Sequence, residues 1–286
     1  MFLTSLILLL LVATFFYLIP LSSHFLRYLW WQFTTDIPVR SGVVISDNSA
    51  IHYQVYGQGQ PVLLLHGGLS NKLSWFSQLP ALTDCGYQLI LVDSRGHGLS
   101  ALGQGELSYR LLANDALAVL DQLQIGRTDI VGWSDGANTA LLMAELWPQR
   151  VARIVSISGN YDPAGLTSLA QQDNFELSTG LKYWLYRWWT GAGAKLSELE
   201  KRLKKLWRSG PKFSAADLRR ITAPVLVIVG DHDIVTLEHT ELMARLLPDS
   251  TLKIIHNGGH ATLMTHPEQV NSLLREFLKT PETHCP

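Results

Sequence analysis

Charge and cysteine are both scarce in this chain, and each shortage excludes a class of protein. The 286 residues include 23 Lys and Arg against 24 Asp and Glu, for a formal net charge of -1. That balance gives no overall attraction to nucleic acid or another polyanion. Two cysteines are too few for a disulfide framework. With 47% hydrophobic residues the chain can bury a large core, so a globular protein is the default.

The N-terminal segment lacks charge altogether. Residues 1–26 contain no Asp, Glu, Lys or Arg, and 2–19 are almost wholly apolar. About 20 apolar residues span the hydrocarbon core of a bilayer, so we predict a single-pass anchor over 1–26 and a linker over 27–41; a buried helix is the alternative. Arg27 and Arg40 flank its far end, which favours a cytoplasmic globular part. The aromatic residues that would suit an interfacial belt are Tyr28, Trp30, Trp31 and Phe33.

Beyond the linker, short apolar runs alternate with segments of helical periodicity. A hairpin is predicted at 42–46 and 50–56, followed by buried strands at 62–65, 88–93, 129–131, 153–157, 225–229 and 252–255. Helices are predicted at 109–123, 135–147, 237–247 and 267–278. Strands that alternate with helices indicate an α/β fold with a mostly parallel sheet covered on both faces.

One long stretch interrupts this alternation. Between the strands ending near Ile157 and starting at Val225 no further strand is predicted, so residues 161–220 read as an inserted helical cap. The cap separates core segments 42–160 and 221–280, and 281–286 form a tail. Within it, leucines from Leu196 to Leu206 share one helical face, while basic residues from Lys201 to Arg208 lie elsewhere. The leucine face would pack on the core, and the basic residues face solvent, an acidic partner or anionic lipid.

A serine stands at the centre of Gly132-Trp133-Ser134-Asp135-Gly136, between a predicted strand and a predicted helix. Glycines at both ends of such a turn allow a tight bend, which exposes the central hydroxyl at the edge of the sheet. Ser134 is therefore a candidate nucleophile.

A serine hydroxyl needs an imidazole to accept its proton and a carboxylate to orient that imidazole. His260 follows the strand ending at Ile255, and Asp231 and Asp233 follow the strand 225–229. Because carboxyl ends of parallel strands meet at one edge of a sheet, these side chains can converge on Ser134. Either aspartate could reach from its loop, and the order Ser, Asp, His is that of α/β-hydrolases.

Four motifs together resemble the α/β-hydrolase family over almost everything from residue 42 onward. Besides the serine turn and Gly258-Gly259-His260, they are His66-Gly67-Gly68 and the segment 93–100, Asp-Ser-Arg-Gly-His-Gly-Leu-Ser. The resemblance implies the triad Ser134, Asp233 and His260, since the family acid lies three residues after the glycine. It also implies an oxyanion hole of backbone amides from Gly68 and Asp135, with Leu69 as the alternative to Gly68, and no cofactor.

Other histidines have structural explanations. His66 and His97 are expected to brace their turns by hydrogen bonds. His256 and His266 could join His260 as metal ligands, but no carboxylate or cysteine stands at ligand spacing, and no metal is predicted.

The substrate is less defined. The turn also resembles that of valacyclovir hydrolase-like amino-acid ester hydrolases, which implies that the Asp135 carboxylate receives an α-ammonium group; as the alternative, it only favours the helix dipole. Further candidate substrate contacts are Trp133, Leu69, Trp184 and Trp188.

We therefore predict a membrane-anchored carboxylesterase-type serine hydrolase acting on a small-molecule ester. Amino-acid ester hydrolases and carrier-protein methyl ester esterases are the nearer alternatives. Carbon-carbon bond hydrolases, perhydrolases and a non-catalytic tethered binding protein are more remote. Ser134 argues against dehalogenases and epoxide hydrolases of this fold, which use an aspartate there.

Overall fold

The sheet of this protein has eight strands and is mostly parallel. The computed structural model describes residues 22–168, 170, 195–281 and 285. The strands lie in the order β1-β2-β4-β3-β5-β6-β7-β8. Their bounds are β1 Val39–Ser46, β2 Ser49–Tyr56, β3 Gln60–Leu65, β4 Tyr87–Val92, β5 Thr128–Trp133, β6 Val151–Ile157, β7 Val225–Gly230 and β8 Ser250–Ile255.

The pairing confirms the predicted hairpin and the predicted parallel core. β1 pairs antiparallel with β2 around Asp47 and Asn48, both of which have positive φ, as a tight primed turn requires. β2 pairs antiparallel with β4, and every later pairing is parallel. The carboxyl ends of six neighbouring strands, β3 to β8, therefore lie at one edge of the sheet.

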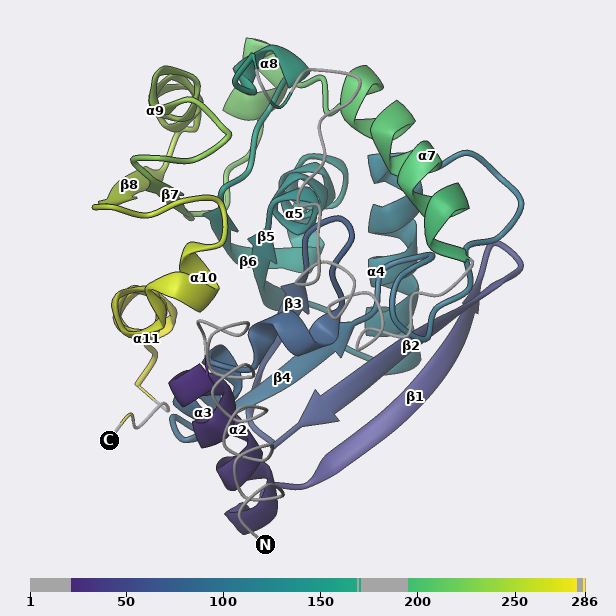
Figure 1. Cartoon of the computed structure of the whole chain (residues 1–286), viewed down its shortest axis with the longest axis vertical. Helices are drawn as coiled ribbons and strands as arrows, with labels where there is room; N and C mark the ends of the chain where they lie inside the picture. The colour runs from purple at the N-terminus through teal and green to yellow at the C-terminus, as the bar shows by residue number, and fades with distance from the viewer. Residues whose placement is uncertain (1–21, 169, 171–194, 282–284, 286) are drawn as a thin grey trace, which may run out of the picture.

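Helices cover both faces of the sheet, as the alternation predicted (Figure 1). α4 (Tyr109–Gln122), α5 (Asp135–Leu146) and α9 (Leu237–Leu246) pack on one face, and α3 (Gln78–Thr83), α10 (Thr262–Thr265) and α11 (Pro267–Leu278) pack on the other. Local signals fix their starts. The Ser108 hydroxyl accepts a hydrogen bond from the amide of Leu111, and Pro267 occupies the first turn of α11.

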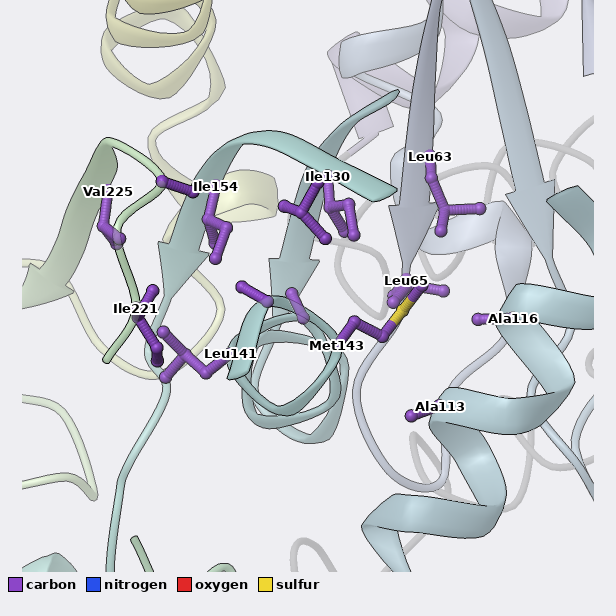
Figure 2. Close-up of a cluster of buried hydrophobic side chains, with 14 of the residues drawn as sticks. Leu63, Leu65, Ala113, Ala116, Ile130, Leu141, Met143, Ile154, Ile221 and Val225 are labelled. Atoms are coloured by element: carbon purple, nitrogen blue, oxygen red, sulfur yellow. The ribbon is translucent and has the colours of Figure 1, made fainter. Parts of the chain in front are cut away.

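Two apolar layers hold the helices to the sheet. Figure 2 shows one of them, in which side chains of β3, β5, β6 and β7 meet those of α4 and α5. Leu63, Ile130, Leu141 and Ile154 in this layer are fully buried. Since strands buried on both faces need apolar residues at successive positions, these runs read as continuous rather than alternating. Together the layers fix where each strand ends, and hence where the loops of the site begin.

The N-terminal helix differs from the predicted linker. Residues 27–34, the first part of the segment predicted as a linker, belong to a helix, α2 (Ser22–Thr34). The reason is packing: Tyr28 is buried, and its ring contacts those of Phe76 and Trp31. Residues 1–21, most of the predicted anchor, lie outside the described residues. Among the helices described, none combines the length and the apolar character needed to cross a bilayer.

The described part of the predicted cap contains two helices, α7 (Lys195–Ser209) and α8 (Ala215–Arg219). Leu199, Leu203 and Leu206 are buried against Leu112 of α4, so the leucine face packs on the core as predicted. Part of the basic charge is used within the protein. Arg202 donates to the carbonyls of residues 103 and 105, and Lys205 pairs with Glu106.

The two cysteines are joined to each other. Cys85, between α3 and β4, forms a disulfide with Cys285 near the C-terminus. The disulfide ties Cys285 to the buried segment between α3 and β4. The remaining short elements are the 3-10 turns η1 Lys72–Trp75, η2 Pro148–Arg150 and η3 Pro163–Gly165.

Candidate active site

Ser134 lies in the sharp turn between β5 and α5. Its backbone angles, φ 54° and ψ -118°, lie outside the regions that residues other than glycine usually adopt. The turn is held by the Ser134 amide, which donates to the carbonyl of Ile157 on β6 at 2.8 Å. A Cβ on Gly136 would collide with the Leu65 carbonyl, and one on Gly132 with the backbone of residue 136. Gly132 is therefore required by the tightness of the turn, as predicted, whereas Gly136 is required because the turn passes close to β3.

The structure brings the three predicted triad side chains together. The Ser134 hydroxyl and Nε2 of His260 lie 2.9 Å apart, and Nδ1 of His260 lies 2.7 Å from Oδ1 of Asp233. The serine comes from the β5 end, the aspartate from the loop after β7 and the histidine from the loop after β8. In this arrangement the hydroxyl can donate to the imidazole, and the imidazole donates to the carboxylate. This is the geometry needed for a serine nucleophile with a general base.

Asp233, rather than Asp231, faces the histidine. Asp233 is buried, which raises its pKa, but hydrogen bonds from His260 and Ser158 and from the Val235 amide outweigh burial and leave the pKa below its usual value. Asp231 contacts two exposed imidazoles outside the relay, those of His232 and His256, each at 2.7 Å. The geometry thus separates the two candidates that the loop sequence left open.

Ser158 is a residue that sequence reasoning missed. It follows β6 directly, has a φ of 54°, and its hydroxyl donates to Oδ2 of Asp233 at 2.5 Å. With His260 on Oδ1, this bond fixes both carboxylate oxygens. No local sequence pattern predicts the positive φ of this residue. Residue 158 lies beside residue 233 only because β6 and β7 are neighbours in the sheet, and the strand order is not readable from the sequence.

The loop after β3 carries the amide predicted to complete the oxyanion hole, and this loop lies beside Ser134. A Cβ on Gly67 would lie 3.0 Å from Cβ of Ser134, so this loop lies against the nucleophile. The amide of Leu69 donates to Nε2 of His97 at 3.0 Å and is already used. No described residue accepts a hydrogen bond from the amide of Gly68 or of Asp135. Of the two alternatives for the loop donor, the geometry therefore favours Gly68.

His66 and His97 brace this loop and the one after β4. Nδ1 of His66 donates to the carbonyl of Gly67, and its Nε2 accepts from the amide of Ser94. Nδ1 of His97 donates to the carbonyl of Arg95. Burial lowers the pKa of both rings, that of His97 to about 3. Both are neutral near pH 7, with each ring using one nitrogen as donor and one as acceptor.

The carboxylate of Asp135 lies beneath the cap helix. It accepts a hydrogen bond from the Tyr109 hydroxyl at 2.7 Å, and the Trp207 indole N–H lies 3.0 and 2.9 Å from its two oxygens. Only 6% of the residue is exposed. Burial raises the pKa of Asp135, and the bonds from Trp207 and Tyr109 act against that rise. The carboxylate predicted to receive a substrate ammonium group thus has partners within the protein.

The other predicted substrate contacts are placed as follows. Trp133 is buried beside the triad, and its indole N–H donates to the carbonyl of His260 at 2.7 Å, so it holds the histidine loop. Leu69 is half-buried and packs against the cluster under α7. Trp184 and Trp188 lie outside the described residues.

The three histidines considered as metal ligands each contact a different group. His260 faces the triad, His256 contacts Asp231, and His266 shares a hydrogen bond with the Thr265 hydroxyl. In the part of the chain that the structure describes, no group of three or more His, Cys, Asp or Glu side chains is arranged to hold a metal ion.

Comparisons with known proteins concern the fold that carries this site. A family model described as "alpha/beta hydrolase fold" matches residues 60–180. Protein ABHD8 of Bos taurus is 30% identical over 247 residues, covering 77% of this chain and 56% of its own. The chain thus spans little more than half the length of this curated relative.

A second relative aligns over nearly its whole length. The putative non-heme chloroperoxidase of Synechocystis sp. is 28% identical over 271 residues, covering 82% of this chain and 97% of its own. Among solved structures, one titled as a membrane phospholipase A matches with a TM-score of 0.71 and 22% identity over 97% of each chain. At that identity the likeness concerns the fold alone.

Proposed function

Because this chain belongs to the α/β-hydrolase family, we propose that it is a serine hydrolase that cleaves a carboxylic ester through an acyl-enzyme. The observation that carries the proposal is the continuous hydrogen-bonded relay from Ser134 through His260 to Asp233. A hydroxyl that donates to a carboxylate-oriented imidazole is activated for attack on an acyl carbon.

In the proposed reaction, Oγ of Ser134 attacks the ester carbonyl carbon and Nε2 of His260 takes the hydroxyl proton. The negative oxygen of the tetrahedral intermediate accepts hydrogen bonds from the amides of Gly68 and Asp135. The carbon-oxygen bond then breaks, and His260 returns the proton to the departing alcohol. A water molecule, deprotonated by His260, then attacks the acyl carbon. The bond from that carbon to Oγ of Ser134 breaks, His260 returns the proton to Oγ, and the carboxylic acid is released. Asp233 stabilises the imidazolium in both halves.

A fluorophosphonate probe tests this proposal. We expect the folded full-length chain to be labelled, and Ser134→Ala to lose the label with its folding unchanged by circular dichroism. Asp231→Asn, which lies outside the relay, is the matched control and should label normally. Folded wild-type protein that does not react would favour the non-catalytic binding protein instead.

The substrate proposal rests on the surroundings of the relay. Since the carboxylate of Asp135 already accepts bonds from Tyr109 and Trp207, amino-acid esters are disfavoured against neutral acyl esters. The p-nitrophenyl esters of graded chain length, compared with amino-acid esters, test this. Faster turnover of amino-acid esters than of neutral esters would contradict it. Parallel assays with a meta-cleavage dienoate and with peroxide plus a carboxylic acid separate the carbon-carbon hydrolase and perhydrolase alternatives.

We also propose that the chain is held at a membrane by residues 1–26, with the globular part on the cytoplasmic side. A specific observation supports contact with a bilayer. Leu26, Trp30 and Phe33 recur at helical spacing on α2 and are 40%, 71% and 87% exposed, while Tyr28 on the other face is buried. Aromatic residues exposed beside an apolar segment are typical of the membrane interface.

Carbonate extraction of cell membranes tests the anchor, and protease protection tests the side. We expect the full chain to stay in the membrane pellet at alkaline pH and to be cut only when the cytoplasmic face is open to protease. Release into the supernatant would contradict the anchor.

Near a bilayer, lipid acyl esters are abundant substrates, so phospholipids should be added to the panel of esters described above. Since α7 lies at the other end of the molecule from α2 in Figure 1, its basic residues are better placed for an acidic partner than for the same bilayer.

A further inference from the structure

Asp135 joins three parts of the protein that are distant in sequence. It opens α5 directly after the nucleophile, Tyr109 opens α4, and Trp207 lies in the last turn of the cap helix α7. The Tyr109 hydroxyl donates to Oδ1, and the Trp207 indole N–H lies within 3.0 Å of both oxygens. We call these three residues the cap clamp.

The cap clamp is buried and continues into the core. Tyr109 is buried, and its hydroxyl also accepts a hydrogen bond from the side chain of Asn138, one turn further along α5. Asn138 in turn is bonded to Asn160, which follows β6. Each side chain in this network has a partner, as buried polar groups require. A network of this kind fixes one arrangement of its members more firmly than apolar packing alone.

The clamp touches both parts of the proposed oxyanion hole. One donor is the amide of Asp135 itself. The other belongs to Gly68, where an added Cβ would lie 2.5 Å from Oδ2 of Asp135 and 2.7 Å from Cζ2 of Trp207. Trp207 and Leu69 also pack against the same cluster under α7. Any shift of Trp207 must therefore move the carboxylate, the loop at residue 68, or both.

The orientation of the Asp135 carboxylate matters because its negative charge lies close to the proposed oxyanion hole. An unpaired anion close to the site would oppose the negative charge that develops on the substrate oxygen. The indole and phenol donors direct both oxygens toward α7 and α4 and offset part of that charge. The donors are neutral, so they bring no positive charge that would compete for the substrate oxygen.

We propose that Trp207 is a positioning residue, which couples the placement of cap helix α7 to the alignment of the two oxyanion amides through the carboxylate of Asp135. The inference rests on the proposed hydrolase function. Docking of the cap and completion of the oxyanion hole are then one event. A substrate that displaces α7 loses transition-state stabilisation even when it reaches Ser134.

Steady-state kinetics of Trp207→Phe test the coupling, because phenylalanine keeps an aromatic ring but has no N–H. We expect kcat for a p-nitrophenyl ester to fall about tenfold with KM changed less than about twofold, short of the 10²- to 10³-fold loss that follows removal of a donor. Trp147→Phe, at the other end of α5, is the matched control and should change neither. A change in KM alone, or no change in kcat, would overturn the proposal.

A double-mutant cycle separates coupling from general damage. Asp135→Ala should lower kcat, Asp135→Asn should retain more activity because its amide oxygen still accepts the indole N–H, and Trp207→Phe should add little in the Asp135→Ala background. Fully additive losses would contradict the clamp.

A measurement that does not depend on activity distinguishes failure of the cap clamp from failure of the proposed hydrolase function. In ¹⁵N-tryptophan spectra, the indole signal lost in Trp207→Phe should shift in Asp135→Ala, whereas the Trp147 signal should not. An unmoved Trp207 signal would overturn the clamp even if the enzyme is active. Inactive wild-type protein with a shifted signal would instead overturn the proposed hydrolase function, and with it the coupling to catalysis.

Discussion

Two buried aspartates flank Ser134, and the protein treats them in opposite ways. Asp233 receives a hydrogen bond from His260, which can carry positive charge, and its pKa lies below the usual value despite burial. Asp135 receives its bonds from the neutral donors Tyr109 and Trp207, and burial leaves its pKa raised. The difference shows that burial alone does not decide the role of a carboxylate. A chargeable partner suits Asp233 to stabilise an imidazolium, whereas neutral donors suit Asp135 to hold the cap.

The largest loss of activity is expected when the charge of Asp233 is removed. Asp233→Asn leaves a group that cannot stabilise the imidazolium of His260, and kcat should fall about 10³- to 10⁴-fold, the loss typical of a serine triad without its acid. Asp231→Asn, two residues away in the same loop, should change kcat less than about twofold, because Asp231 contacts two exposed imidazoles and the Asn257 amide and does not contact Ser134, His260 or Asp233. Ester hydrolysis by both variants checks this. Similar losses in the two variants would contradict the assignment of Asp233.

A smaller effect is expected from Ser158→Ala. The change removes the donor to Oδ2 of Asp233, so the pKa of Asp233 should rise and kcat should fall about tenfold, corresponding to about 1.4 kcal/mol, near the value of a hydrogen bond to a charged group. Ser156→Ala is the matched control, because the buried hydroxyl of Ser156, two residues earlier on β6, has no described partner. If both variants retain wild-type kcat, Ser158 does not position the acid.

The smallest signal is a difference in how stability depends on pH. The lowered pKa of Asp233 contributes stability that is present above the ordinary carboxyl pKa near 3.8 and is lost as pH falls through the folded-state value. The raised pKa of Asp135 acts in the other direction: protonation stabilises the folded state below 3.8, and that contribution is lost as pH rises through the folded-state value.

Urea unfolding at a series of pH values measures both contributions. With rising pH, the unfolding free energy of wild type relative to Asp233→Asn should increase, and that relative to Asp135→Asn should decrease. Two differences with the same slope would show that the two carboxylates are not held in opposite ways.

Much of the fold could be predicted because its signals are local. The positions of the strands to within about three residues, the hairpin and four helices follow from apolar periodicity, and the turn at Ser134 follows from two glycines that close contacts require. The loops carrying Asp233 and His260 could be identified because both follow strand ends in a parallel sheet.

The rest depends on contacts between distant residues. Trp207 lies 72 positions from Asp135, and Ser158 lies 75 positions from Asp233. No spacing rule reaches that far in one sequence. The helix at 27–34 was missed because aromatic residues beside an apolar segment suggested a membrane belt, whereas Tyr28 packs on the core and only Trp30 and Phe33 face outward. The interpretation of Asp135 as an ammonium site was likewise made without knowledge of Tyr109 and Trp207, whose donors bind its carboxylate.

Trapping the acyl-enzyme tests the central claim most directly. Full-length protein would be mixed with a p-nitrophenyl ester, quenched in acid before the second half-reaction is complete, digested, and examined by mass spectrometry. The account predicts one acyl group on the peptide that contains Ser134, with none in Ser134→Ala. Hydrolysis without an acylated peptide, or acylation at another residue that persists in Ser134→Ala, would contradict it.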